Sequence, residues 1–214
     1  MKTLITTVAA IAIATPAFAG DLPSKAAPAS APVAAAKSSS DSYITVDTGY
    51  EADKSKYGFN DRKNNTYNFT FNHSFAGGFN AGFAAGTGQV YNHGHLDQTL
   101  EAQGGYSLPS ILGVSLSGKV GVGEHFTYGK NYPYYAVYGN IYYKVGKNIT
   151  FNAVQYRYRN AFDSANLFES HQIGTGMTYN VVGNHSVYGV LYRNLDNKYN
   201  PVDNGVTVGY KYDF

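Results

Sequence analysis

The chain contains no cysteine and no tryptophan among its 214 residues. Without cysteine, disulfide bonds and thiolate metal sites are excluded, so an exported domain of this size must be stabilised in another way. Charged residues make up only 14% of the chain, against roughly 25% in typical soluble domains. The formal net charge of +2 is too small to indicate a nucleic-acid partner.

Long hydrophobic runs are missing after the first residues. The apolar stretch 4–14 follows Lys2 and precedes Ala17 and Ala19, which is the pattern of a secretory signal peptide with an Ala-x-Ala cleavage site. This stretch is too short for a membrane-spanning helix, and no later segment offers the ~18 consecutive apolar residues that such a helix needs. The sequence therefore predicts a signal peptide at residues 1–19, export through the periplasm and no transmembrane helix in the mature chain.

Aromatic residues and alternating patterns are abundant instead, with 21 Tyr and 12 Phe. The last ten residues show the pattern most clearly. One face carries Val206, Val208, Tyr210, Tyr212 and Phe214, and the other carries Thr207, Gly209, Lys211 and Asp213. A period of two predicts a strand with an apolar medium on one side and a polar medium on the other. Few charges and many tyrosines suit a wall with lipid outside and water inside.

Ten segments from Ser42 onward share this alternation. They lie at about 44–50, 66–75, 79–89, 98–108, 113–124, 134–144, 149–159, 171–181, 185–193 and 205–214. The apolar set changes parity within the seventh segment, and a β-bulge near Ala153 would reconcile its two halves. In the ninth segment we expect Tyr188, Val190 and Tyr192 to point outward. The third and ninth segments are the weakest, and the loss of both would leave eight strands.

The connections between the segments differ in length. Tight turns are expected at 76–78, 109–110, 146–148 and 183–184, and longer polar connections at about 51–65, 90–97, 124–133, 160–169 and 194–203. Short turns on one rim and long loops on the other are typical of outer-membrane barrels. The predicted fold class is therefore all-β, a transmembrane antiparallel up-and-down β-barrel at residues 42–214 with ten strands, or alternatively eight.

Two segments carry a resemblance to known proteins. The alternating strand 205–214, which ends on an aromatic residue, resembles the closing strand of bacterial outer-membrane β-barrels. That resemblance implies that Tyr210, Tyr212 and Phe214 form the signal read by the barrel-assembly machinery. The run Asp21-Leu22-Pro23-Ser24-Lys25, followed by Ala and Pro, resembles the mature start of small porin-like alphaproteobacterial outer-membrane proteins of the Omp25/Omp31 type, which usually have eight strands.

The resemblance to bacterial outer-membrane proteins implies a location in the cell outer membrane, in contact with its lipid and lipopolysaccharide. Residues 20–41 are rich in Ala, Pro and Ser and offer almost nothing to pack. We expect them to form a disordered periplasmic spacer.

Charged residues on the polar faces are the candidates for a functional lumen. The expected register points Asp47, Glu101, Lys119, Arg157 and Arg159 inward. One interpretation is a stabilising ion-pair network, because an unpaired buried charge is costly. The other is a constriction that passes small polar solutes through a narrow barrel.

No catalytic triad, phosphate loop or nucleotide fingerprint is present. His93, His95 and Asp97 have the residue types of a metal site, but nothing in their glycine-containing segment would fix a coordination geometry, so no metal and no cofactor are predicted. We expect a non-enzymatic outer-membrane barrel that contributes to envelope integrity, with a narrow nonspecific channel as its further role. One alternative is a surface interaction protein that acts through its external loops, and another is a hydrolase that uses His93 and Asp97.

Overall fold

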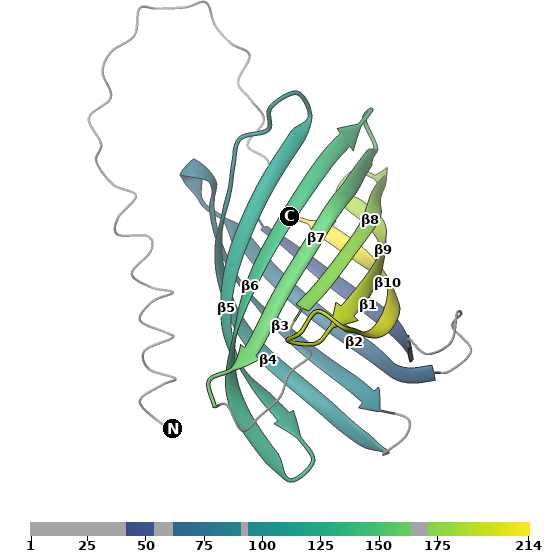
Figure 1. Cartoon of the computed structure of the whole chain (residues 1–214). Helices are drawn as coiled ribbons and strands as arrows, with labels where there is room; N and C mark the ends of the chain where they lie inside the picture. The colour runs from purple at the N-terminus through teal and green to yellow at the C-terminus, as the bar shows by residue number, and fades with distance from the viewer. Residues whose placement is uncertain (1–41, 54–61, 91–93, 164–170) are drawn as a thin grey trace, which may run out of the picture.

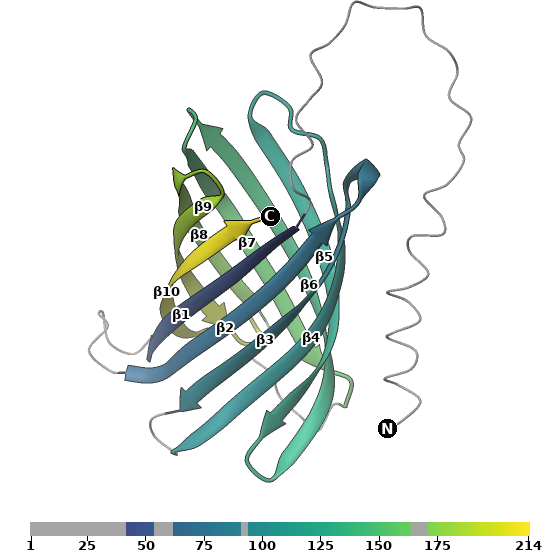
Figure 2. The same cartoon turned by 180° about the vertical axis from the view of Figure 1, so that it is seen from behind.

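The structure, a computed structural model, describes residues 42–53, 62–90, 94–163 and 171–214. In this part of the chain ten antiparallel strands close into a barrel in the order β1-β10-β9-β8-β7-β6-β5-β4-β3-β2 (Figures 1 and 2). The ten-strand prediction is confirmed, and the eight-strand alternative is wrong. The predicted signal peptide, the predicted spacer and His93 lie outside the described residues.

Each strand is 11 to 16 residues long, which is enough to cross a bilayer at a tilt. The strands are β1 (Ser42–Asp53), β2 (Arg62–Ser74), β3 (Phe79–Val90), β4 (His95–Ser107), β5 (Val114–Thr127), β6 (Lys130–Val145), β7 (Ile149–Ala161), β8 (His171–Val182), β9 (His185–Leu195) and β10 (Pro201–Asp213). No helix in the described segments is long and apolar enough to cross a bilayer.

The barrel closes where the first strand meets the last. Ser42 and Phe214 exchange two backbone hydrogen bonds, with N···O distances of 3.4 and 2.9 Å. Every strand consequently has a partner on both sides, so no edge presents unpaired backbone groups to a membrane. Both ends of the described chain lie at the rim that also carries the short connections 146–148 and 183–184, which we call the short-turn rim. The opposite end is the loop rim.

The distribution of side chains is inverted relative to a soluble globule. Large apolar side chains on the exterior are exposed, for example Val46 at 53%, Leu191 at 57% and Val208 at 55%. The largest fully buried side chains include Glu101, Asn194 and Asp203. Because apolar groups avoid water and charged groups seek polar partners, this surface is suited to hydrocarbon outside and to a polar interior.

Aromatic rings gather on the exterior at two levels. Towards the short-turn rim, Phe79 packs on Tyr106 with ring centroids 5.0 Å apart, and Tyr212 stacks on Phe214 at 6.1 Å. Towards the loop rim, the Tyr135 ring lies 6.0 Å from that of Tyr158. Two aromatic belts at these levels are the arrangement in which amphipathic rings sit at membrane–water interfaces.

The register of β9 differs from the one expected. Tyr188, Val190 and Tyr192 face the interior, and Val187, Gly189 and Leu191 face outward, in register with Tyr210, Val208 and Val206 of β10. The expectation that Tyr188, Val190 and Tyr192 point outward is therefore wrong. The physical reason is that a tyrosine is apolar along its ring and polar at its hydroxyl, so it suits either face and does not fix the parity of a strand.

The bulge in β7 is confirmed. Ile141 of β6 pairs with Val154 and Tyr142 pairs with Asn152, so Ala153 has no partner of its own. The pairing with β8 is interrupted at the same place, between Asn152 and Gln155. Both halves of the strand can thus turn their apolar side chains outward.

On the loop rim the connections are shorter than expected, because the strands extend beyond their predicted ends. The predicted long connection at 124–133 is wrong: β5 and β6 continue to a two-residue turn at Tyr128 and Gly129, where Gly129 has a φ of 78°. A glycine accepts this left-handed conformation without strain. On the opposite rim, the turn predicted at 109–110 is a six-residue connection, 108–113.

Candidate functional site: the barrel lumen

The structure places Asp47, Glu101, Lys119, Arg157 and Arg159 on the inward faces of β1, β4, β5 and β7. Their hydrogen bonds and ion pairs join strands that are not neighbours in the sheet, such as β5 with β1 and β7 with β4. Only contacts through the interior can do this in a closed barrel. The five residues do not form one ring, because they are distributed over separate clusters at different heights.

The first cluster surrounds Glu101, whose side chain is 1% exposed. Its carboxylate accepts hydrogen bonds from Gln103 at 2.7 Å and from the Tyr138 hydroxyl. The Arg159 guanidinium lies 3.7 Å from the same carboxylate and donates to the Tyr138 hydroxyl at 3.3 Å. It also covers the Tyr134 ring at 5.4 Å. A buried acid and a base from strands three apart are thus held together across the lumen.

The second cluster lies along β1. Asp47 accepts hydrogen bonds from Asn68 and from the Tyr188 hydroxyl, both at 2.6 Å. Glu51, four residues further along the strand, accepts from Tyr192 at 2.9 Å and from Asn194 at 3.2 Å. The hydrogen-bond donors named here are neutral. They solvate the charge of both carboxylates within the wall.

The third cluster surrounds Lys119. Its ammonium group donates to Asn72 Oδ1 at 3.1 Å and to the Tyr43 hydroxyl at 3.3 Å. The Lys211 ammonium covers the same Tyr43 ring at 4.6 Å and pairs with Asp213 at 2.7 Å. The charge of Lys119 thus meets neutral acceptors among the described residues.

Arg157 lies two residues from Arg159 on the same face of β7, a spacing of about 6.6 Å along a strand. Within the described segments no carboxylate lies within ion-pair distance of its guanidinium. Arg157 and Lys119 therefore bring positive charge to the lumen that no direct ion pair cancels.

Large inward side chains lie flat against the wall because glycines on neighbouring strands leave room for them. A Cβ built on Gly205 would overlap the Tyr192 ring, and one on Gly121 would lie 2.7 Å from the Glu101 carboxylate. A Cβ on Gly123 would lie 2.9 Å from the Tyr134 ring. Real Cβ atoms do not come this close, so each of these glycines is required by the side chain that covers it.

Several lumen residues escaped the sequence analysis. Tyr188 and Tyr192 were expected outside, and Glu51, Asn194 and Asp203 were assigned to connections. Gly205 and Gly209 on β10 were a usable signal, since an inward glycine marks close approach of another group. The sequence does not reveal which group that is, because Tyr188 and Asp47 are 141 residues apart.

Of the residues considered for metal binding, His93 and the side chain of His95 lie outside the described part of the structure, so that site is not tested. Asp97 lies 3.9 Å from His125, whose other ring nitrogen meets the Tyr132 hydroxyl at 2.8 Å. No group of three or more potential ligands is present among the described side chains.

No protein-family profile matches the chain, and no curated protein sequence matches it. Of the solved structures named below, the first has a TM-score above 0.5, and only that one bears on the fold. The β domain of the Bordetella autotransporter BrkA has a TM-score of 0.51 at 10% identity, over 81% of this chain and 99% of that one. The KdgM porin in complex with disordered oligogalacturonate has a TM-score of 0.46 at 13% identity, over 79% and 99%. Neisserial surface protein A has a TM-score of 0.41 at 10% identity, over 83% and 100%.

At these identities the likeness concerns the fold alone, and the resemblance to proteins of the Omp25/Omp31 type stays a prediction. A closed antiparallel barrel with an apolar exterior, two aromatic belts and a charged interior has the architecture of an integral outer-membrane β-barrel.

Proposed function

We propose that this barrel contributes to the integrity of the outer membrane and passes small polar solutes through a narrow, charged lumen. The observation that carries this proposal is the incomplete filling of the interior. The inward side chains of Asp47, Lys119, Tyr138, Arg157 and Tyr188 all remain partly exposed, although they project into a closed wall. Side chains that line a water-filled lumen would keep such exposed surface.

The arrangement of the large side chains supports a passage that is narrow but not plugged. The rings of Tyr134, Tyr188 and Tyr192 lie over glycines of the neighbouring strands, at Gly123, Gly209 and Gly205. The Glu101–Arg159 pair and the Lys119 contacts do cross the lumen, at different heights. Ten strands stand just above the eight that side chains fill completely, so the remaining space suits solutes not much larger than hydrated ions.

Single-channel recording in a planar bilayer tests this proposal. We expect discrete, reproducible conductance steps from the refolded barrel. Arg157→Gln removes a lumen cation that has no direct ion pair among the described side chains. The reversal potential in a salt gradient should therefore shift in the direction of greater cation selectivity. Lys147→Gln, in the turn between β6 and β7, removes the same charge outside the lumen and should change selectivity far less. A silent bilayer, with the folded state verified by heat-modifiable gel mobility, would contradict a channel.

A surface interaction role is the second candidate, and the β5–β6 hairpin supports it. Tyr128 at its tip is 76% exposed, and the nearby exterior carries the exposed apolar side chains of Leu96 and Phe126. These residues line a hollow together with Gly94, Gln98 and Thr127. Replacing Tyr128 by Ser should weaken adherence of cells that display the barrel, without altering conductance, if this hairpin binds a partner. Unchanged adherence would count against the role.

A further inference from the structure

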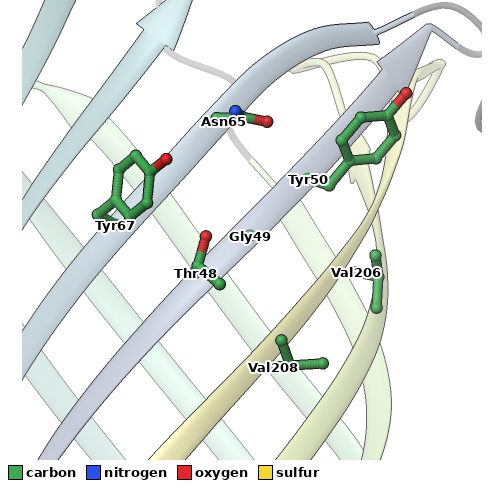
Figure 3. Close-up of a pocket in the computed structure, with 7 residues that line it drawn as sticks. All are labelled: Thr48, Gly49, Tyr50, Asn65, Tyr67, Val206 and Val208. Carbon is green, nitrogen blue, oxygen red and sulfur yellow. The ribbon is translucent and has the colours of Figure 1, made fainter.

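A groove runs along the exterior of β10, β1 and β2 towards the loop rim. It is lined by Thr48, Gly49, Tyr50, Asn65, Tyr67, Val206 and Val208. Figure 3 shows the two tyrosine rings on β1 and β2, the two valines on β10 and the strand backbone at Gly49 between them. The groove therefore combines an apolar flank with aromatic groups at the height of the aromatic belt that lies towards the loop rim.

A cation lies beside this groove on the same outward face. Arg193 of β9 pairs in register with Asn204 of β10 and donates its Nε–H to the Asn204 side chain at 2.8 Å. Asn204 is two residues from Val206, about 6.6 Å along a strand. The guanidinium thus stands at the end of the groove that is nearer the loop rim.

The position of Arg193 is unusual for this barrel. Other lysines and arginines on the strands face inward. Examples are Lys119, Arg157, Arg159 and Lys211. An arginine on the lipid face is costly at the bilayer midplane and costs close to nothing at the interface. Because Arg193 lies near the loop rim, its position on the lipid face costs little free energy. An anion beside the guanidinium would make that position favourable. The Asn204 side chain accepts a hydrogen bond from one N–H of the Arg193 guanidinium, which has five N–H donors.

We propose that this face binds one outer-leaflet lipid whose phosphate-bearing headgroup carries a net negative charge, as that of lipid A does. An acyl chain lies in the groove against Val206 and Val208, and the phosphate is held by Arg193. The rings of Tyr50 on β1 and Tyr67 on β2 flank the acyl chain on the side away from Arg193, since β10 lies between β9 and β1. Charge complementarity favours a headgroup with a net negative charge over a zwitterionic one, and the apolar flank favours a lipid over a free anion. The site lies outside the lumen, so its failure would leave the channel proposal intact.

Native mass spectrometry of the full barrel, delipidated and then exposed to lipid A in detergent, tests this site. We expect one retained lipid A per barrel. Arg193→Gln should lower its retention roughly tenfold, the worth of one charge-assisted hydrogen bond. Thr48→Phe fills the groove with an apolar ring and leaves every charge in place, and it should also lower retention. Lys147→Gln, on the opposite rim, serves as the matched control and should retain lipid A fully.

Both site variants must first show heat-modifiable mobility and wild-type conductance, which establish an intact barrel. Unchanged retention in either of them would overturn the combined site, as would equal retention of phosphatidylcholine. Competition by inorganic phosphate as strong as that by lipid A would show that the site takes a free anion and would likewise overturn the lipid assignment.

Discussion

Glycines inside the barrel determine where the large lumen side chains lie. Gly205 shows this clearly, since a methyl group there would overlap the Tyr192 ring that donates to Glu51. We predict that Gly205→Ala destabilises the barrel by about 1–3 kcal/mol, the usual effect of overpacking. Urea unfolding in vesicles measures the change.

Gly189→Ala is the matched control for this prediction. Gly189 faces outward, and the nearest atom to its Cβ position is 3.9 Å away, so the change in stability should be small. The double variant Gly205→Ala with Tyr192→Ala should recover part of the loss. Equal effects at Gly205 and Gly189 would contradict the role assigned to the inward glycine.

The buried Glu101–Arg159 pair gives a second prediction at the scale of the residue. Glu101→Gln leaves Arg159 facing a neutral amide, and breaking one side of a buried pair costs about 3 kcal/mol. The double variant Glu101→Gln with Arg159→Met removes both charges and should regain much of that stability. Glu124→Gln, which changes an outward carboxylate, is the control for the loss of a charge. Additive losses in the double variant would show that the two groups do not interact.

The sequence predicted the inward position of the five charged candidates, because alternation alone assigns a face to each residue of a strand. It could not predict their partners. Tyr188 and Asp47 meet across β10, and Lys119 meets Tyr43 from 76 residues away. Such contacts follow from the strand order and stagger of the closed barrel, which no local pattern contains.

At the scale of the strand, the bulge in β7 explains why one segment carries two apolar parities. Ala153 is the extra residue, and Phe151 and Val154 on either side of it both face outward. We predict that deletion of Ala153 is tolerated, since the shortened strand alternates without interruption. Deletion of Val137 from the regular strand β6 should abolish folding, because every residue on one side of it would change face. Heat-modifiable mobility of the two deletion variants distinguishes them, and failure of both would contradict the assignment of the bulge.

The closing strand gives the second prediction at this scale. Phe214 packs against Phe71, with ring centroids 6.3 Å apart, and its backbone pairs with Ser42. If Tyr210, Tyr212 and Phe214 form the assembly signal, Phe214→Ala should lower the amount of barrel in the outer membrane several-fold in cells, while the purified variant still refolds in detergent. Phe79→Ala, which removes an exposed ring from another strand, is the control. Normal assembly of Phe214→Ala would remove the terminal aromatic from the signal.

Strand boundaries were less predictable than strand number. The apolar alternation marks only the part of each strand that faces hydrocarbon, and β5 and β6 continue past it with polar residues as far as Gly129. Those residues pair through their backbones, which a hydropathy pattern does not report. A hydropathy pattern also could not determine which face of β9 points inward. Its inward face carries tyrosine, which suits either side, so the register with β10 determines the orientation.

At the scale of the whole molecule, the account depends on one inversion: exposed apolar side chains cover the exterior, and the largest fully buried side chains include Glu101, Asn194 and Asp203. Lipid contact, the lumen and the exterior groove all follow from it. Strand β9 is the sharpest place to test the inversion, because its inward tyrosines contradict a simple reading of its sequence. The chain has no cysteine, so single cysteines can be introduced at any position and spin-labelled without interference.

The most direct measurement is electron paramagnetic resonance accessibility along β9, with one spin label at a time at positions 187 to 192 in lipid vesicles. Labels at 187, 189 and 191 should be accessible to oxygen dissolved in the bilayer. Labels at 188, 190 and 192 should respond to a water-soluble nickel chelate or to neither reagent. The opposite phase, or no alternation at all, would contradict the inverted barrel and the lumen built on it.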